Sequence, residues 1–226
     1  MLPSKNVARI RGLLRGTGGD PRKLAINVTH SMYYRSVIRN TRYHGVQILK
    51  SPLDLWIYQE LLSRDPVDLV VETGTFNGGS ALYLAHLMDQ LGRGRVLSID
   101  IDFDESWPKH PRIEYLTASS VAETTIQKVH RAAADADRTM VILDSDHARD
   151  HVLAEMRAYA DLVSIGSYLI VEDGNVNGNP VFVDHGPGPQ EAIGAFLAER
   201  RNFVVDKDQE KFLLTMNPNG YLKRAS

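Results

Sequence analysis

The sequence contains no cysteine among its 226 residues. Without cysteine the chain can form neither a disulfide framework nor a thiolate metal site, so any bound metal must take oxygen or nitrogen ligands. The same absence favours a cytoplasmic location, because disulfides persist mainly in oxidising compartments.

Two further absences narrow the class of protein. No apolar run approaches the roughly 20 residues needed to span a bilayer, and the N-terminus lacks the apolar core of a secretory signal. We therefore expect a soluble, unprocessed chain without a membrane partner. Neither charge dominates, since 26 Lys and Arg residues stand against 28 Asp and Glu residues. No global field draws the chain to nucleic acid, and a small molecule is the expected partner.

The chain has enough apolar material for a full core. With 43% hydrophobic residues, its length fits one domain or one domain plus an extension. Helical patterns dominate before residue 66, over residues 24–39 and in a segment that Ser51 and Pro52 open as cap and first helical residue. We predict a helical N-terminal extension over residues 1–65 and a second domain over residues 66–226.

Beyond residue 66, short apolar strands alternate with helical stretches. This alternation is typical of βαβ units, which form a parallel sheet covered by helices on both faces. At the C-terminus, apolar segments at 203–205 and 212–214 flank a polar turn and predict an antiparallel hairpin that closes the sheet. The other predicted strands cover residues 68–71, 96–99, 113–116, 140–143 and 168–171.

The most informative segment is VVETGTFNGGS, in which an apolar strand ends at Glu72 and turns through a glycine-rich loop into a helix. Gly74 and Gly78 would let the backbone pass close to a ligand, and the first helical turn, with Ser80, offers free N–H groups to an anionic group. The spacing differs from the G-x-G-x-x-G of dinucleotide sites, so a carboxylate-bearing nucleoside fits better. A plain tight turn is the structural alternative.

Asp100 ends the next predicted strand, 28 residues after Glu72. An acidic side chain at this place in a βαβ unit can accept hydrogen bonds from ribose hydroxyls. Ser119, after the third strand, could line an adenine pocket or cap the following helix. The loop and Asp100 together predict a nucleoside pocket at the carboxyl ends of the strands, where ligands bind in open parallel sheets.

VVETGTFNGGSAL and SIDID resemble the binding signature of class I S-adenosylmethionine-dependent methyltransferases. More narrowly, SPLDLWIYQELL, VEDGN, GPGPQEAI and EKFLLTMNPNGYLKR resemble the cephalosporin hydroxylase / rhamnosyl O-methyltransferase family, from about His44 to the C-terminus. The resemblance implies a Rossmann-like α/β fold whose sheet has seven strands, mostly parallel with an antiparallel last strand. It also implies S-adenosyl-L-methionine as cofactor and a homo-oligomer. The residues expected to contact the cofactor are Glu72, Gly74, Thr75, Phe76, Gly78, Ser80, Asp100, Ser119 and Asp144.

Three carboxylates follow two later apolar strands, Asp144 after VIL and Glu172 and Asp173 after YLIV. Neighbouring strand ends would bring these side chains together, and they would repel one another unless a cation lay among them. An all-oxygen set suits Mg²⁺, although each acid alone could be a solvated loop residue or a helix cap. The predicted metal ligands are Asp144, Glu172 and Asp173.

The same spacing resembles that of the divalent-metal-dependent catechol-type O-methyltransferases. Asp144, His147, Glu172 and Asp173 match that family's first ligand, its base and its last two ligands. That family has a lysine where this chain has His147, and Asp-Asn where this chain has Glu-Asp, so a metal here would meet one more negative charge. Asp146 competes with Asp144 as the first ligand, and the sequence leaves both open.

His147 is the predicted catalytic general base. A neutral imidazole, with an ordinary pKa of about 6.5, can take a proton from a hydroxyl that a bound cation has made more acidic. The alternative is that His147 only caps the helix that starts near Ala148.

The sequence therefore predicts a Mg²⁺-dependent O-methyltransferase that moves a methyl group from S-adenosylmethionine to a hydroxyl of a sugar or antibiotic-type small molecule in secondary metabolism. An oxygenase of a β-lactam-like scaffold is one alternative, but its iron site needs two histidines and a carboxylate, and the chain has no H-x-D or H-x-E pair. A non-catalytic nucleoside-binding module is another, and it would need only the glycine loop and Asp100.

Overall fold

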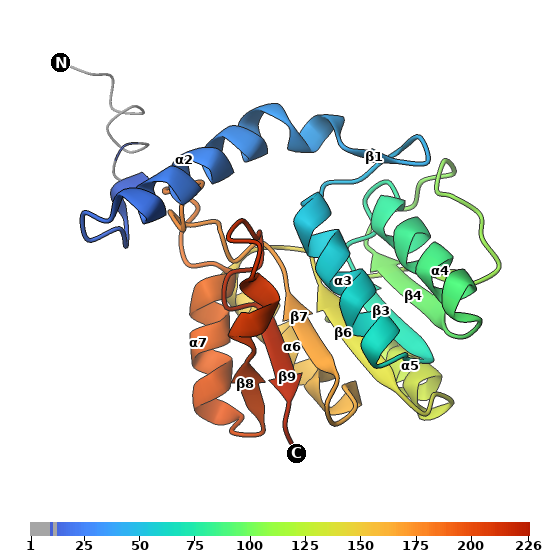
Figure 1. Cartoon of the computed structure of the whole chain (residues 1–226). Helices are drawn as coiled ribbons and strands as arrows, with labels where there is room; N and C mark the ends of the chain where they lie inside the picture. The colour runs from blue at the N-terminus through green and yellow to red at the C-terminus, as the bar shows by residue number, and fades with distance from the viewer. Residues whose placement is uncertain (1–9, 11–12) are drawn as a thin grey trace.

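The computed structural model describes residue 10 and residues 13–226. Residues 1–9 and 11–12 of the predicted extension lie outside the described residues. The fold is built on a seven-stranded sheet with the strand order β5-β4-β3-β6-β7-β9-β8 (Figure 1). The strands are β3 (Leu69–Thr73), β4 (Arg95–Asp100), β5 (Ile113–Thr117), β6 (Thr139–Leu143), β7 (Tyr168–Val171), β8 (Phe203–Val205) and β9 (Tyr221–Arg224).

Strands β3 to β7 pair in parallel, and β9 runs antiparallel to both of its neighbours, β7 and β8. The predicted seven-stranded, mostly parallel sheet with an antiparallel last strand is confirmed. The five strands predicted before the C-terminal hairpin are also confirmed, with ends shifted by up to two residues. They form here because their branched and aliphatic side chains suit a sheet that is buried on both faces.

The predicted C-terminal hairpin is wrong in its second strand. Strand β8 pairs with β9, whereas the segment 212–214 forms no strand and leaves Leu213 70% exposed. A short 3-10 helix, η3 (Lys207–Glu210), lies between β8 and the segment 212–214. Tyr221 and Leu222 of β9 are fully buried, so the strand gains apolar contacts on both faces that 212–214 would not provide.

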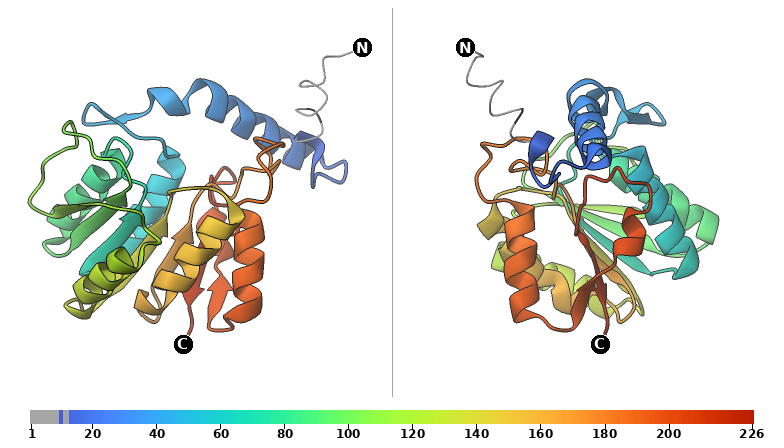
Figure 2. Two further views of the ribbon diagram at one scale, coloured as in Figure 1. Left: turned by 180° about the vertical axis from the view of Figure 1, so that it is seen from behind. Right: turned by 60° about the vertical axis from the view of Figure 1, so that its left-hand side comes forward.

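Helices cover both faces of the sheet, as Figure 2 shows from two sides. Side chains alternate along each strand, so Leu69 and Val71 of β3 join one core cluster and Val70 joins the other. The cluster with Val70 includes apolar residues of α3 (Pro52–Arg64) and α4 (Gly79–Leu91). The opposite cluster includes residues of α5 (Glu123–Ala134), α6 (Arg149–Tyr159) and α7 (Pro189–Glu199), and a short 3-10 helix, η2 (Ala160–Leu162), follows α6.

The segment before the sheet contains α2 (Pro21–Ser36), the 3-10 helix η1 (Ile38–Asn40) and a small hairpin of β1 (Arg42–Tyr43) and β2 (Val46–Gln47). Helix α2 lies across the edge of the sheet at the carboxyl ends of the parallel strands (Figure 1). Helix α3 begins as predicted, with Ser51 accepting a hydrogen bond from Leu53 N at 3.2 Å and Pro52 in the first turn. Since Ile57 and Leu61 pack in the core of the sheet, this part of the predicted extension contributes to the core. The domain boundary at residue 66 stays a prediction.

In the described part of the chain, no helix combines the length and the apolar character that crossing a bilayer requires.

Candidate active site

The glycine loop between β3 and α4 has a geometry that only glycine permits at two positions. Gly74 has φ +87°, and a Cβ there would lie 2.0 Å from the carbonyl oxygen of Asp144. Gly78 has φ +75° and caps α4, and a Cβ there would lie 2.6 Å from Pro108 Cδ. Glycine therefore allows the ends of β3 and β6 to meet and the chain to turn tightly into the helix.

Glu72 lies in β3 just before this loop and is fully buried. Ser98 donates a hydrogen bond of 2.8 Å to Glu72 Oε2, whereas Oε1 has no partner among the described residues. Burial raises the pKa of Glu72 above its usual range. A buried carboxylate oxygen without a donor is costly, which indicates a place for a ligand donor.

Asp100, at the end of β4, fixes the glycine loop by accepting a hydrogen bond from its backbone. Its Oδ2 accepts a hydrogen bond from Phe76 N at 2.9 Å, and its Oδ1 accepts one from Asp102 N at 3.1 Å. Trp107 Nε1 in turn donates to the carbonyl oxygen of Phe76 at 2.6 Å. Both carboxylate oxygens keep further lone pairs, so Asp100 can still accept hydrogen bonds from hydroxyls.

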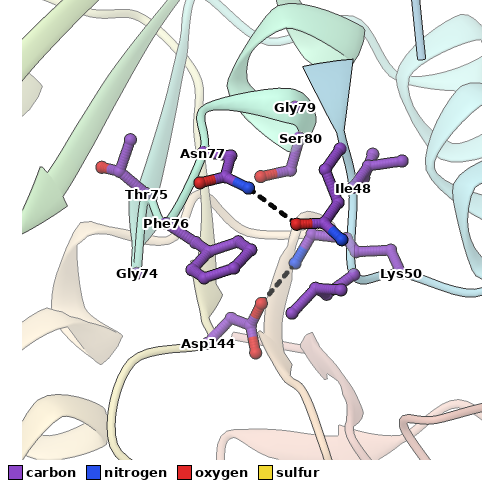
Figure 3. A pocket seen from close by; sticks show the side chains of 11 residues that line it. Ile48, Lys50, Gly74, Thr75, Phe76, Asn77, Gly79, Ser80 and Asp144 are labelled. Carbon is purple, nitrogen blue, oxygen red and sulfur yellow. Dashed lines mark hydrogen bonds and ion pairs between the residues drawn. The ribbon is translucent and has the colours of Figure 1, made fainter. Parts of the chain in front are cut away.

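A pocket lies between this loop and the segment 47–50 (Figure 3). Asn77 Nδ2 donates to Gln47 Oε1 at 2.8 Å and thereby joins the two walls. Of the residues predicted to contact the cofactor, Gly74, Thr75, Phe76, Ser80 and Asp144 line the pocket.

The remaining predicted cofactor residues, Glu72, Gly78, Asp100 and Ser119, do not line this pocket. The alternative role of Ser119 as a helix cap is wrong, because α5 begins at Glu123 and its N-cap is Ala122, without a side-chain hydrogen bond.

The acids predicted as metal ligands meet beside the pocket, but not all in the same way. Ligand atoms of Asp144, His147 and Asp173 all lie within 4.8 Å of one another, and no other such group of three occurs among residues 10 and 13–226. His147 Nε2 lies 3.4 Å from Asp144 Oδ1 and 3.3 Å from Asp173 Oδ2. Asp146 is outside the group and accepts a hydrogen bond from Ala148 N at 2.7 Å.

The helix-cap alternative for His147 also fails in its geometry. Helix α6 begins at Arg149 with Ala148 as its N-cap, and the Asp146 carboxylate accepts the hydrogen bond from the Ala148 amide. The ring nitrogen of His147 points to the two carboxylates instead.

Glu172 is buried close to this cluster, but Lys50 contacts it. Lys50 Nζ lies 2.6 Å from Glu172 Oε1 and 2.6 Å from Asp144 Oδ2, and only 3% of the Lys50 side chain is exposed. Tyr58 also donates a hydrogen bond of 2.7 Å to Glu172 Oε1. The structure thus brings Asp144 and Asp173 together with His147, and it pairs Glu172 with Lys50, which is not among the predicted site residues.

A signal for Lys50 is present in the sequence. Lys50 follows the apolar pair Ile48-Leu49 and precedes the helix start at Ser51-Pro52. This position next to apolar residues indicates that its side chain is buried. A lysine in such a place must find a carboxylate, because an unpaired buried ammonium is very unfavourable.

The electrostatics of the cluster follow from these contacts. Burial disfavours the charged form of His147, but the hydrogen bond with Asp144 and the charge of Asp173 outweigh it and raise the pKa of His147 to about 9. Burial likewise opposes the charge of Lys50, but Asp144 and Glu172 hold the pKa of Lys50 above its usual value. Burial raises the pKa of Asp173 to about 6 and that of Glu172 to about 8. Two cations and three acids therefore share one buried site.

Helix α2 contacts both Asp173 and the loop 174–188. Tyr34 OH donates to Asp173 Oδ2 at 3.3 Å, and its ring makes an edge contact with Phe182 of the loop, with 5.1 Å between ring centroids. The side chains of Asn175 and His30 share a buried hydrogen bond of 2.8 Å. The helical pattern of residues 24–39 does not by itself predict that α2 contacts the site.

A protein-family model described as Rhamnosyl O-methyltransferase/CmcI matches residues 35–225 of this sequence. The chain belongs to the rhamnosyl O-methyltransferase/CmcI family. The resemblance stated from the sequence motifs is thereby confirmed, and so is the predicted enzyme class, an S-adenosylmethionine-dependent O-methyltransferase.

Members of the rhamnosyl O-methyltransferase/CmcI family from mycobacteria are similar over most of their length. The rhamnosyl O-methyltransferase of Mycobacterium tuberculosis H37Rv is 40% identical over 203 residues, which cover 86% of this chain and 83% of the relative. That of Mycobacterium leprae is 38% identical over 205 residues, with 86% and 88% covered. A solved structure of CmcI with Mg and SAM has a TM-score of 0.67 and 22% identity, covering 84% of this chain and 79% of that chain. This neighbour supports the fold.

Proposed function

We propose that this O-methyltransferase transfers the methyl group of S-adenosylmethionine to a sugar hydroxyl, with Mg²⁺ held at the carboxylate cluster and His147 as general base. The observation that carries the proposal is the convergence of Asp144, His147 and Asp173 within 4.8 Å, at a pocket walled by the glycine loop. A methyl donor in that pocket would lie beside groups that can bind a cation and accept a proton.

The pocket and its surroundings fit S-adenosylmethionine in their donors and acceptors. Asp100 has free lone pairs for hydroxyls, Glu72 Oε1 is buried without a donor, and the N-terminus of α4 at Gly79 and Ser80 offers N–H groups to a carboxylate. The CmcI structure holds SAM in the same fold, which agrees with this assignment. We assign the predicted cofactor residues to this role.

The carboxylates fit Mg²⁺, which prefers oxygen ligands. Ligand oxygens of Asp144 and Asp173 lie within 4.8 Å of each other, and Lys50 bridges Glu172 to Asp144. We keep Asp144, Glu172 and Asp173 as the proposed ligands, with Glu172 exchanging Lys50 for the metal. A bound Mg²⁺ would orient the acceptor hydroxyl and make it more acidic.

His147 is placed to receive the hydroxyl proton at Nε2, the atom that faces both carboxylates. Without metal, the neighbouring negative charges raise the pKa of His147 to about 9, so the ring carries a proton at neutral pH. Cation binding by those carboxylates cancels the charges that hold this proton. His147 is therefore a competent base only when the carboxylates are neutralised.

A sugar hydroxyl is the proposed acceptor because relatives at 38% and 40% identity are named rhamnosyl O-methyltransferases. The antibiotic-type acceptor, the cytoplasmic location and the homo-oligomer stay predictions. The oxygenase alternative lacks support, since the cluster found in the described residues contains one histidine and two carboxylates.

The test is methyl transfer from labelled S-adenosylmethionine to a rhamnosyl glycoside, with Mg²⁺ or with EDTA. We expect activity with Mg²⁺ and its loss with EDTA or in the Asp144→Ala variant. Asp150→Ala is the matched control, because the Asp150 side chain is 91% exposed. Full activity after complete metal removal would contradict the metal site, and absence of cofactor binding by calorimetry would contradict the whole proposal.

A further inference from the structure

Lys50 occupies a position that the proposed reaction does not explain. Its ammonium group lies 2.6 Å from one oxygen of Asp144 and 2.6 Å from one oxygen of Glu172, and its side chain is buried. Figure 3 shows Lys50 on the pocket wall opposite the glycine loop, directed toward Asp144. A cation with two short contacts to acids of the proposed metal site occupies oxygens that a metal ion would also use.

A buried hydrogen-bond network fixes Glu172, one of the two acids that Lys50 contacts. Tyr58 OH donates to Glu172 Oε1 at 2.7 Å, and Asn217 Nδ2 donates to Tyr58 OH at 3.0 Å. Asn217 Nδ2 also reaches Tyr221 OH at 3.4 Å, and Tyr221 OH donates to Asp54 Oδ1 at 2.8 Å. Glu172 is therefore held from the C-terminal strand and from α3, and Lys50 meets a preorganised partner.

The charge balance of the carboxylate cluster explains why a lysine is buried there. Asp144, Glu172 and Asp173 would carry three negative charges if all were ionised, and burying them together without cations is very unfavourable. Lys50 supplies one permanent positive charge among them. A divalent ion then meets two net negative charges instead of three, before any charge on His147 is counted.

We propose that Lys50 is a positioning residue that acts as a tethered counter-cation: it keeps the metal-free site folded and lowers the affinity of the site for divalent ions. The inference rests on the metal site proposed above. In the metal-free protein Lys50 pairs with Asp144 and Glu172 and offsets one of their negative charges, and metal binding must compete with it for the same oxygens. The site is thereby set to bind Mg²⁺ weakly and reversibly.

The direct experiment is calorimetric titration of the chelator-treated full chain with MgCl₂ alone, without cofactor. Lys50→Met removes the charge and keeps a side chain of similar length. We expect Lys50→Met to bind Mg²⁺ at least about tenfold more tightly than wild type, because a positive charge a few ångströms away is lost from a poorly solvated site. Lys211→Met is the matched control, since Lys211 pairs with Glu60 at the surface. Its affinity for Mg²⁺ should equal that of wild type.

Thermal unfolding gives a readout that does not depend on activity. In EDTA, Lys50→Met should melt below wild type, and Mg²⁺ should raise its Tm by more than it raises that of wild type. The double variant Lys50→Met/Glu172→Gln restores the net charge, so it should recover stability in EDTA and bind Mg²⁺ more weakly than Lys50→Met. If Lys50→Met folds only when Mg²⁺ is present, that result supports the proposal.

Three outcomes would overturn it. Wild type and Lys50→Met binding Mg²⁺ with equal affinity, or Lys50→Met binding it more weakly, would remove the competition while leaving the proposed function intact. Misfolding of Lys50→Met and of the double variant, with and without Mg²⁺, would show that Lys50 acts through packing. Failure of wild type and variant alike to bind Mg²⁺ would remove the proposed metal site and this inference with it.

Discussion

Asp100 ends β4 and Asp144 follows β6, the two strands that flank β3, yet the surroundings of the two acids differ. The oxygens of Asp100 accept hydrogen bonds from the backbone amides of Phe76 and Asp102. Those of Asp144 face the charged side chain of Lys50 and the ring of His147. Equivalent places in a parallel sheet thus hold two acids with different chemistry. Neutral donors suit Asp100 to binding hydroxyls, and ionic partners suit Asp144 to handling cations and protons.

We call the surroundings of Asp100 and the glycine loop the cofactor side, and those of Asp144, Glu172 and Asp173 the cation side. The two sides are nevertheless in contact. Gly74, in the loop on the Asp100 side, lies so close to the Asp144 backbone that a Cβ would be 2.0 Å from its carbonyl oxygen. Under the proposed function, a methyl donor bound beside Asp100 would lie close to an acceptor held beside Asp144, and methyl transfer depends on such alignment. The comparison predicts that each side can be impaired separately.

The largest expected effect concerns His147, on the cation side. His147→Ala removes the proposed base, and we expect kcat to fall by about 10²–10⁴-fold, the usual contribution of a positioned base. Binding of S-adenosylmethionine should change little, because His147 does not line the pocket. Turnover assays and calorimetry check the two parts. His130→Ala, an exposed histidine bonded to the Ala158 carbonyl, is the control. Equal loss of cofactor binding in His147→Ala would contradict the separation.

A smaller effect concerns α2, which contacts the cation side. His30 of α2 shares a buried hydrogen bond with Asn175 of the loop 174–188. Burial lowers the pKa of His30 to about 4, so the folded protein keeps it neutral while the unfolded chain takes up a proton below pH 6.5. Its contribution to stability is complete above pH 6.5 and is lost as the pH falls toward 4. We expect wild type to lose about 2–3 kcal/mol between pH 7 and 4.5 from this group alone.

Urea unfolding at both pH values measures this effect as a difference between variants. His30→Gln can still accept the hydrogen bond from Asn175, and it has no proton to gain. Its loss of stability on acidification should be smaller than that of wild type by the same amount. Parallel curves for the two proteins would show that His30 is not a source of acid sensitivity.

These contrasts also mark what the sequence could predict. Strand ends are readable because apolar runs stop where polar residues begin, and this placed Glu72, Asp100, Asp144 and the Glu172-Asp173 pair on one edge of the sheet. Asp144 could be distinguished from Asp146 only in three dimensions, where the Asp146 carboxylate accepts a hydrogen bond from the Ala148 amide. The pattern identifies which elements carry acids, and packing decides where each side chain points.

The missed residues come from segments whose paths periodicity does not describe. Tyr34 reaches Asp173 because α2 crosses the sheet edge, and Lys50 reaches Glu172 because the chain returns through the β1–β2 hairpin. The strand predicted at 212–214 is wrong for a related reason. Residues 212–214 are apolar enough to suggest a strand, but Tyr221 and Leu222 have the register that fills the gap between β7 and β8.

On the cofactor side, Asp100→Ala should raise the Kd for S-adenosylmethionine by about 10–100-fold, as expected when charge-assisted hydrogen bonds are lost. The kcat at saturating cofactor should stay close to that of wild type, which is the reverse of the His147→Ala result. Asp102→Ala is a neighbouring control, because the Asp102 side chain is exposed and only its amide contacts Asp100. A fall in kcat without a change in Kd would place Asp100 in the chemistry and remove the contrast between the two sides.

The smallest effect is expected at Thr215, whose hydroxyl donates to Asp54 Oδ1 in the buried network that ends at Glu172. Thr215→Val keeps the shape but removes both the donor to Asp54 and the acceptor of the hydrogen bond from Asn217 N, while Met216 N and Tyr221 OH continue to donate to Asp54. We therefore expect a loss of about 1–2 kcal/mol in the free energy of unfolding, with Thr215→Ser close to wild type. Because Glu172 belongs to the cation side, Thr215→Val should also alter the Mg²⁺ affinity slightly and leave the Kd for S-adenosylmethionine unchanged. A change confined to cofactor binding would mean that the network supports the opposite side of the site.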